Sequence, residues 1–327
     1  MTNEKQLDQF YTQDSISSQC LSEAVEVLHK LYPSMKDILF LEPSAGDGSF
    51  IRALKSIEEL KDNKYYACDV DPRANDILKR DFLKDNLHNE LPDKSQVITI
   101  GNPPFGKKGK IASNFINNAF MYSETVCFIL PLQFQKHSGH NQITKQAKLI
   151  LDKKLKPNSF LFKQAEYSVR CCFQIWTIKR TELKDLRLRK SPITKHKDFE
   201  MWQYNNTKTA EKFFNKEVYK WDFAVPRQGY KDYTLKETNP EIMDRRTQWI
   251  FFKAKNDEIL ERLRKLDFVK LSQKNTSIPG FGKADVIEEY CNTYKDNSVI
   301  STSTQTFQFE LPNPSLAGTF LFNSEMK

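Results

Sequence analysis

One short segment, residues 37–54, constrains the fold more than any other part of the sequence. An apolar run ends in Glu42, a loop containing Gly46 and Gly48 follows, and residues 51–54 have helical spacing. Strand, glycine-containing loop and helix in this order open a nucleotide-binding α/β sheet. The loop matches neither the dinucleotide fingerprint nor a P-loop. The alternative is an ordinary connection between a strand and a helix.

A second acidic residue follows the next expected strand, residues 64–68. Asp69 lies about 20 residues beyond the glycines, where such sheets hold a ribose diol. Asp71 precedes a proline and is expected to shape the turn. Before the third strand, Asp81 could accept from an adenine amino group, and Phe82 could flank the adenine ring.

The sequence Asn102-Pro103-Pro104-Phe105 ends another apolar run, residues 97–101. The Asn102 amide oxygen and the Pro103 carbonyl are adjacent acceptors, and the prolines stiffen this corner because each fixes φ. Two fixed acceptors can hold both hydrogens of an amino group on a flat ring, which frees its lone pair for attack. Phe105 offers a face for that ring. The alternative is a strand that ends in a Pro-Pro turn.

With these motifs in this order, the chain resembles the S-adenosylmethionine-dependent methyltransferases of the amino class. Within that class it is similar to the gamma-type DNA adenine N6-methyltransferases, including those of restriction–modification systems. The match covers roughly residues 7 to 180 and includes Gln9-Phe10-Tyr11-Thr12 ahead of the glycine loop. Gln13-Asp14 departs from the family, in which a proline is frequent there.

The resemblance implies S-adenosylmethionine as the cofactor and assigns roles to the motif residues. The expected cofactor-binding residues are Tyr11, Thr12, Glu42, Ser44, Ala45, Gly46, Gly48, Asp69, Asp81 and Phe82. The expected catalytic residues are Asn102, Pro103, Pro104 and Phe105. In this family a second aromatic residue, on a late strand, also packs on the target base. Phe173 is the best local match, and a plain core aromatic is an equal alternative.

Strands and helices alternate through residue 150, which predicts a mostly parallel sheet covered by helices on both faces. Residues 159–162 and 169–178 suit an antiparallel hairpin. The expected fold class is α/β: a Rossmann-like, seven-stranded methyltransferase sheet with its last strand reversed, plus a C-terminal α+β target-recognition region. We place the S-adenosylmethionine-binding catalytic domain at residues 1–180 and the nucleic-acid recognition region at residues 181–327.

Composition favours a cytoplasmic protein with a polyanionic partner. The net charge is +8 and the isoelectric point about 9.0, which suits nucleic acid. The six cysteines lack metal-site spacing, so we expect no metal and reduced, packed thiols. No apolar stretch reaches the roughly 20 residues that span a bilayer, and we expect no membrane partner.

Three basic features could contact the substrate. Lys107 and Lys108 belong to a flexible loop beside the expected catalytic corner, although solvated lysine loops are common. Residues 179–197 hold eight Lys and Arg against two acids, and this run could follow a phosphate backbone or be a linker. Arg227 lies near the tip of a strand-to-turn segment and could contact guanine edges.

The leading hypothesis is a site-specific DNA methyltransferase that transfers a methyl group to N6 of a flipped-out adenine. A cognate endonuclease is a candidate partner. An RNA adenine N6-methyltransferase is the alternative, because the adenine ring is the same. Protein glutamine methyltransferases also carry Asn-Pro-Pro-aromatic, but they usually have a more glycine-rich first loop and lack a basic second domain. A non-catalytic nucleic-acid-binding protein with a relic fold is the third alternative, which the intact Glu42, Asp69 and Asp81 oppose.

Overall fold

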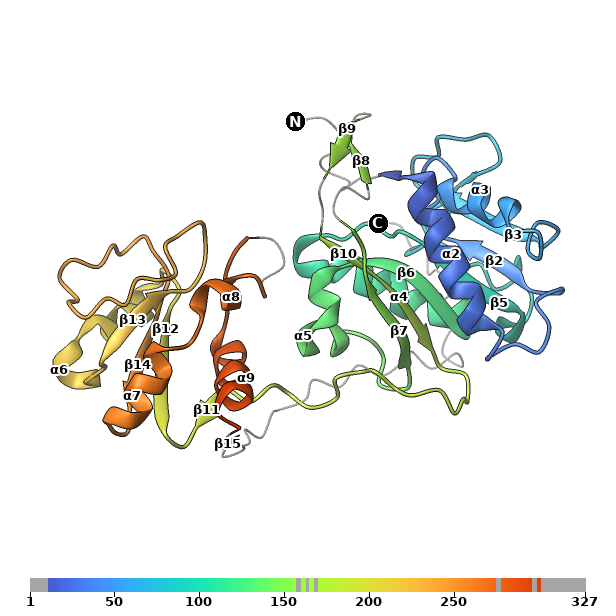
Figure 1. Ribbon diagram of the computed structural model, residues 1–327. Coiled ribbons are helices and arrows are strands. Elements are labelled where there is room, and N and C mark those ends of the chain that lie inside the picture. Colours follow the sequence, from blue (N-terminus) through green and yellow to red (C-terminus); the bar gives the residue numbers. More distant parts are fainter. Residues whose placement is uncertain are drawn as a thin grey trace, which may run out of the picture.

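The computed structural model describes residues 11–156, 160–162, 165–167, 170–274, 278–295 and 299–300. Within these ranges the elements form two bodies joined by an extended segment (Figure 1). We call residues 11–189 the first body and residues 195–300 the second body, both with the gaps just given.

A seven-stranded sheet forms the centre of the first body. Its strand order is β4-β3-β2-β5-β6-β10-β7. In this order the strands are Leu78–Lys79, Tyr65–Asp69, Leu39–Glu42, Val97–Gly101, Thr125–Pro131, Cys171–Thr177 and Lys148–Lys154. The first five are mutually parallel, and β10 is antiparallel to both of its neighbours. The predicted seven-stranded α/β sheet with its last strand reversed is therefore confirmed.

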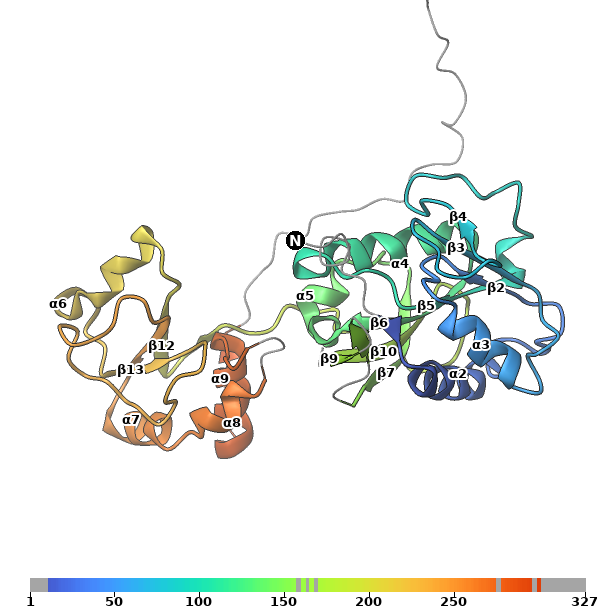
Figure 2. The same cartoon turned by 90° about the horizontal axis from the view of Figure 1, so that it is seen from above.

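Helices cover both faces of this sheet (Figure 2). α2 (Asp14–Leu28) and α3 (Ser49–Ser56) pack on one face, and α4 (Lys110–Tyr122) packs on the other. Side chains alternate along β10, since Cys171 joins the core under α2 and Cys172 joins the core under α4. The first body also contains α5 (His137–His140) and three 3-10 helices, η1 (Lys94–Gln96), η2 (Lys107–Gly109) and η3 (Leu132–Gln135).

The prediction of a hairpin between residues 159–162 and 169–178 is wrong. β10 pairs instead with β7, which the sequence analysis did not identify as a strand. The end of β7 carries Asp152, Lys153 and Lys154, and charged residues are common on an edge strand. β8 (Phe160–Phe162) pairs with β9 (Ala165–Tyr167) and with β1 (Tyr11–Thr12) in a separate small sheet.

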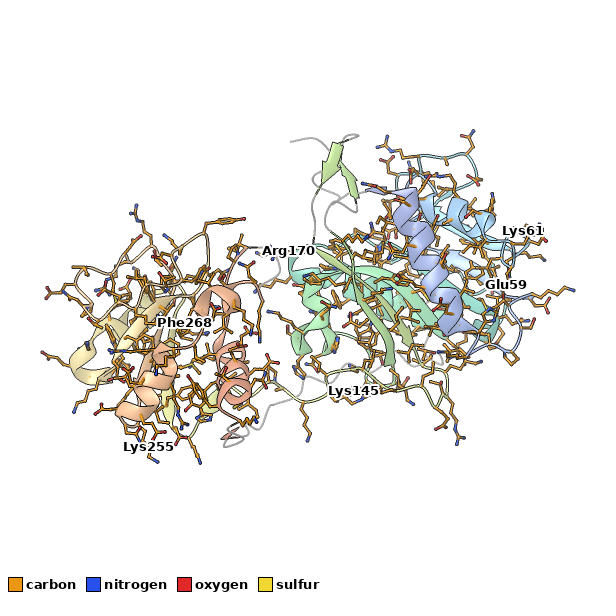
Figure 3. All side chains as sticks on the ribbon, viewed as in Figure 1. Glu59, Lys61, Lys145, Arg170, Lys255 and Phe268 are labelled. Carbon is orange, nitrogen blue, oxygen red and sulfur yellow. The ribbon has the colours of Figure 1, made fainter. Side chains whose placement is uncertain are left out.

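The second body is built on an antiparallel sheet with the order β12-β14-β13. These strands are Phe199–Tyr204, Trp249–Ala254 and Phe223–Pro226. One face packs against α7 (Asp257–Arg264), α8 (Phe268–Ser272) and α9 (Lys283–Tyr294), with Phe268 in the core between them (Figure 3). The other face packs against η4 (Lys208–Phe214), next to α6 (Lys216–Tyr219). A two-residue strand, β11 (Lys195–His196), pairs with β15 (Val299–Ile300). This body is α+β, as predicted.

The segment that leaves the first body is held to it by Arg187. The guanidinium donates to the carbonyl oxygens of four residues of the 140–147 loop, at 2.6 to 3.0 Å. It also lies over the Trp176 ring, 5.6 Å from the centroid. Burial lowers the pKa of this guanidinium to about 10, so its charge is retained at neutral pH. Arg187 is thus committed to the protein and is not placed to follow a phosphate backbone, a correction to one interpretation of residues 179–197.

Within the described ranges, no helix is long and apolar enough to cross a membrane. The same residues contain no group of His, Cys, Asp or Glu suited to a metal ion.

Candidate active site at the carboxyl edge of the first sheet

A cavity of about 240 Å³ lies at the carboxyl ends of β2, β3 and β5. The chain builds β2, β3 and β4 in one direction and then returns to β5, so the cavity lies where the strand order reverses. In open α/β sheets this is the usual position for a ligand. Most of the cofactor-binding and catalytic residues predicted from the sequence line this cavity: Thr12, Glu42, Ser44, Ala45, Gly46, Asp69, Asp81, Phe82, Asn102, Pro103, Pro104 and Phe105.

Asp69, at the end of β3, fixes the position of the loop between β2 and α3. One carboxylate oxygen of Asp69 accepts from the Gly46 amide at 2.9 Å, and the other accepts from the Asp71 amide at 2.8 Å. Because a carboxylate offers about four acceptor positions, both oxygens can still accept from a ligand. Gly48 is not part of the lining. Its φ of 82° turns the chain into α3, a conformation that favours glycine.

Glu42 is the most deeply buried acid of the cavity, with 1% of its surface exposed. Burial raises its pKa well above the ordinary value, and the charges of Asp47 and Asp69 raise the pKa further. Among the described residues, its Oε2 and the Ser44 hydroxyl are buried without a hydrogen-bond partner. Two unsatisfied polar groups of this kind are costly unless a ligand completes them. An ammonium group fits the position, so the residues suit the amino acid end of S-adenosylmethionine.

The N-terminal strand brings Thr12 to the Asn102–Phe105 corner. The Asn102 Nδ2 donates to the Thr12 hydroxyl oxygen at 3.1 Å, across 90 residues of sequence. Thr12 itself is 6% exposed. The side chain of Tyr11 lies outside the described residues, as do Gln9 and Phe10.

Arg52 links the start of α2 to the glycine loop, a role that the sequence analysis missed. Its guanidinium contacts Asp14 at 2.7 Å and Asp47 at 3.2 Å. Nearby, the Ser17 hydroxyl donates to the Ser49 carbonyl at 3.1 Å. Asp14 is one of the two residues at which the sequence departs from the family pattern. No local signal joins Asp14 to Arg52, because they lie 38 residues apart.

The residue before the Asn102–Phe105 corner lies close to Glu42. Gly101 has a φ of 138°, and a Cβ at this position would lie 3.4 Å from Glu42 Cγ. Phe105 is half-buried and lines the cavity together with Ile111 and Phe115. The sequence analysis used the latter two only as helix-packing residues. They extend the apolar side of the cavity, where a flat ring would lie.

Three aromatic or basic predictions have different outcomes. Phe173 is fully buried in the core under α2 and does not line the cavity, so its alternative role as a core aromatic is the one observed. Phe82 lines the cavity but is only 1% exposed, and its ring centroid lies 5.5 Å from that of Phe115. Lys107 and Lys108 are exposed on η2, outside the lining, and Lys108 has a φ of 54°. Their contact with a substrate stays a prediction.

Arg227 belongs to the second body, and its guanidinium is already engaged. It donates to the side-chain oxygens of Asn205 at 2.8 Å and Gln248 at 2.7 Å, and to the Phe281 carbonyl at 3.3 Å. Burial lowers its pKa below the ordinary value. In this structure Arg227 connects three segments and does not present a free fork to a base.

No protein-family model and no curated protein matches the chain. Among solved structures, it is similar to a putative class I S-adenosylmethionine-dependent methyltransferase from Listeria monocytogenes (18% identity, TM-score 0.39, 55% of this chain and 64% of that one). It is also similar to a putative RNA methyltransferase from Pyrococcus horikoshii (16%, 0.38, 52% and 88%).

A third similar structure is the methyltransferase subunit of a type I restriction-modification system from Streptococcus thermophilus (14%, 0.38, 55% and 45%). The chain spans less than two thirds of the Listeria and Streptococcus proteins. At this level of similarity, none of the three assigns a substrate to this chain.

Proposed function

We propose that this chain is an S-adenosylmethionine-dependent methyltransferase that methylates N6 of an adenine flipped out of DNA. One observation carries the proposal: the Asn102–Phe105 corner and the buried Glu42 line the same cavity, and a Cβ at Gly101, the residue before this corner, would lie 3.4 Å from Glu42 Cγ. A seat for an ammonium group and a pair of acceptors for an aromatic amine therefore lie side by side.

When bound, the cofactor supplies an electrophilic methyl group on a sulfonium. Glu42 and the Gly46 loop would hold its amino acid end, and Asp69 would accept from its ribose. Asn102 and the Pro103 carbonyl would accept the two amine hydrogens, which would leave the nitrogen lone pair free to attack. The nitrogen then loses one proton to solvent. Fixed acceptors of this kind stabilise the transition state because they need no reorganisation.

Phe105, with Ile111 and Phe115, offers an apolar wall for the displaced base. Flipping costs a few kcal/mol, and stacking on an aromatic ring returns roughly 1 to 3 kcal/mol per base. The resemblance of Tyr11-Thr12 to the DNA-methylating family favours DNA. Membership of a restriction–modification pair, and hence a cognate endonuclease, is part of the same proposal.

The test is transfer of label from methyl-labelled S-adenosylmethionine to DNA and to RNA of matched sequence, followed by analysis of the labelled base. We expect label on adenine N6 of DNA. Asn102→Ala should reduce the rate by about 10²-fold or more, as when a preorganised partner of the transition state is removed, while cofactor binding persists. Asn292→Ala, an exposed change on α9, is the matched control and should leave the rate unchanged.

Label in RNA or in a protein glutamine would keep the chemistry and overturn the substrate. A folded Asn102→Ala protein that is as active as the control would overturn the mechanism.

A further inference from the structure

The two outer surfaces of the second body differ in how their charges are paired. η4 with α6 and the group α7–α9 lie on opposite sides of the sheet (Figure 2). On the helical side four cations are paired with acids: Arg262 with Glu258, Arg264 with Glu261, Lys270 with Glu289, and Lys274 with Glu288. Lys265 is exposed there and forms no ion pair among the described residues. The paired charges largely cancel at short range, so this surface attracts an anion weakly.

The opposite surface, formed by residues 208–220, has lysines without such partners. Lysines recur there at every fourth position: Lys208, Lys212, Lys216 and Lys220. Among the described residues none of the four forms an ion pair, although Glu211 and Glu217 belong to the same segment. Lys208, Lys212 and Lys220 are exposed.

Arg245 extends this surface from the loop before β14. It is exposed and forms no ion pair among the described residues, and its guanidinium lies 3.5 Å from the Phe214 ring centroid. The Tyr204 hydroxyl donates to the Arg245 carbonyl at 2.8 Å. The Arg245 backbone is thereby held beside the end of β12, and its charge is fixed next to the lysine segment.

Three partly buried aromatic residues lie between the lysine segment and the core of the second body. Trp202, Phe213 and Tyr219 pack against one another, with Tyr219 edge-on to both of the others at 5.4 and 5.1 Å. Lys212 lies over the Phe213 ring, 5.6 Å from its centroid. These contacts leave less ring face for a base.

The amides on this surface are also engaged within the protein. Asn206 donates to the Arg246 carbonyl, and Asn215 caps α6 by accepting from the Val218 amide. Asn205 accepts from Arg227. Direct recognition of a base edge requires a free amide or a free guanidinium fork. The Arg245 guanidinium lies over the Phe214 ring and donates to the Pro240 carbonyl at 3.4 Å, so it is not a free fork either. Lysines without acidic partners suit phosphates, which position a nucleic acid without specifying its sequence.

We infer that the lysine surface of residues 208–220, together with Arg245, is where the second body holds the phosphate backbone of the nucleic-acid substrate. This inference rests on the proposed function, because it assumes that the substrate is a nucleic acid. It assigns the contact to one of the two outer surfaces and predicts that the contact is independent of sequence.

The test replaces three lysines on each surface and compares salt dependence. One variant carries Lys208→Gln, Lys212→Gln and Lys220→Gln. The matched control carries Lys255→Gln, Lys265→Gln and Lys270→Gln, with Lys255 at the outer edge of the second body (Figure 3). Both lose three positive charges, so the overall field changes equally. Thermal unfolding and S-adenosylmethionine binding by the first body establish that each variant is folded.

Affinity for a DNA duplex is then measured by fluorescence anisotropy across a salt series. Each phosphate contact contributes about 0.9 to the slope of log affinity against log salt. We expect the first variant to lose about 2 to 3 of that slope, equally for duplexes of unrelated sequence. The control should keep the wild-type slope. Equal slopes for the two variants, or binding of a nucleic acid by neither the wild type nor the control, would overturn the inference.

The outcome is separable from the proposed function. Label transfer to RNA with a slope change confined to the first variant, measured on RNA, would overturn the DNA substrate and keep the surface. Label transfer to DNA with identical slopes for both variants would keep the chemistry and overturn the surface.

Discussion

In the first body, polar side chains converge on one edge of a sheet, whereas in the second body they are spread over two outer surfaces. The difference follows from topology. Adjacent parallel strands end at the same edge, so Glu42, Asp69 and Asn102, each at or just after a strand end, must meet there. The antiparallel strands of the second body end at alternate edges. In the second body, a charged side chain can attract a ligand only where no neighbouring residue neutralises its charge.

The two basic segments of the chain sharpen this comparison. Residues 179–197 have the higher density of positive charge, but three of their eight cations are engaged: Arg187 by four carbonyls, Arg189 by Asp185 at 2.7 Å and Lys179 by Glu124 at 3.3 Å. Residues 208–220 are less basic along the sequence, and among the described residues none of their lysines forms an ion pair, although Lys216 donates to the Thr238 carbonyl. A count of charges therefore does not locate a nucleic-acid surface, because the neighbours of each charge decide its availability.

The largest expected effect concerns Arg187. Arg187→Ala should lower the free energy of unfolding of the first body by about 3 kcal/mol, since buried carbonyls lose a charged donor worth about 1.5 to 3 kcal/mol per hydrogen bond and regain only part of it from water. Chemical denaturation measures this change. Arg189→Ala removes an exposed ion pair and should cost less than about 1 kcal/mol. Equal losses would mean that burial does not distinguish the two arginines, and the assignment of Arg187 as a structural residue of the first body would fail.

A smaller effect is expected at Asp69. Asp69→Ala removes the acceptor for the Gly46 and Asp71 amides and for the cofactor ribose, so affinity for S-adenosylmethionine should fall by about 1.5 to 3 kcal/mol, or roughly 10- to 150-fold. Calorimetric titration gives the dissociation constant. Asp232→Ala, on an exposed turn of the second body, is the control. An unchanged constant for Asp69→Ala would remove this residue from the site and weaken the case for convergence at one edge.

The smallest expected effect is a proton exchange at Glu42. Its raised pKa means that the ligand-free protein keeps this carboxyl protonated above the pH at which an ordinary carboxyl ionises. Because the folded protein binds this proton more tightly than the unfolded chain does, protonated Glu42 favours folding. This contribution to stability is complete at low pH and is lost as the pH rises from the unfolded pKa of Glu42 towards its folded pKa. An ammonium ligand favours the ionised form, so binding in that pH window should release up to one proton.

Calorimetry in two buffers of different ionisation enthalpy counts the proton released by Glu42. Glu42→Gln keeps the shape and should abolish the release. A proton count that is the same in wild type and Glu42→Gln would show that this carboxyl does not hold the ammonium group.

The sequence was sufficient to predict that Glu42, Asp69 and Asn102 lie together, because each follows or ends a parallel strand and such strands end at one edge of the sheet. It was insufficient for Phe173, since β10 lies between two strands and is buried on both faces, so no alternation distinguishes a core ring from a cavity ring. It was also insufficient for Arg187. The four carbonyls that bind this residue lie 40 to 47 residues earlier in the chain, and no local sequence pattern indicates them.

The approach of Gly101 to Glu42 couples two parts of the cavity lining. A Cβ at position 101 would lie 3.4 Å from Glu42 Cγ, and the φ of 138° there favours glycine. A larger side chain at position 101 would therefore strain the backbone next to Asn102 and press on Glu42 at the same time. If the proposed function holds, a change of acceptor preference is expected instead from the apolar residues around Phe105, because substitutions there leave this approach unchanged.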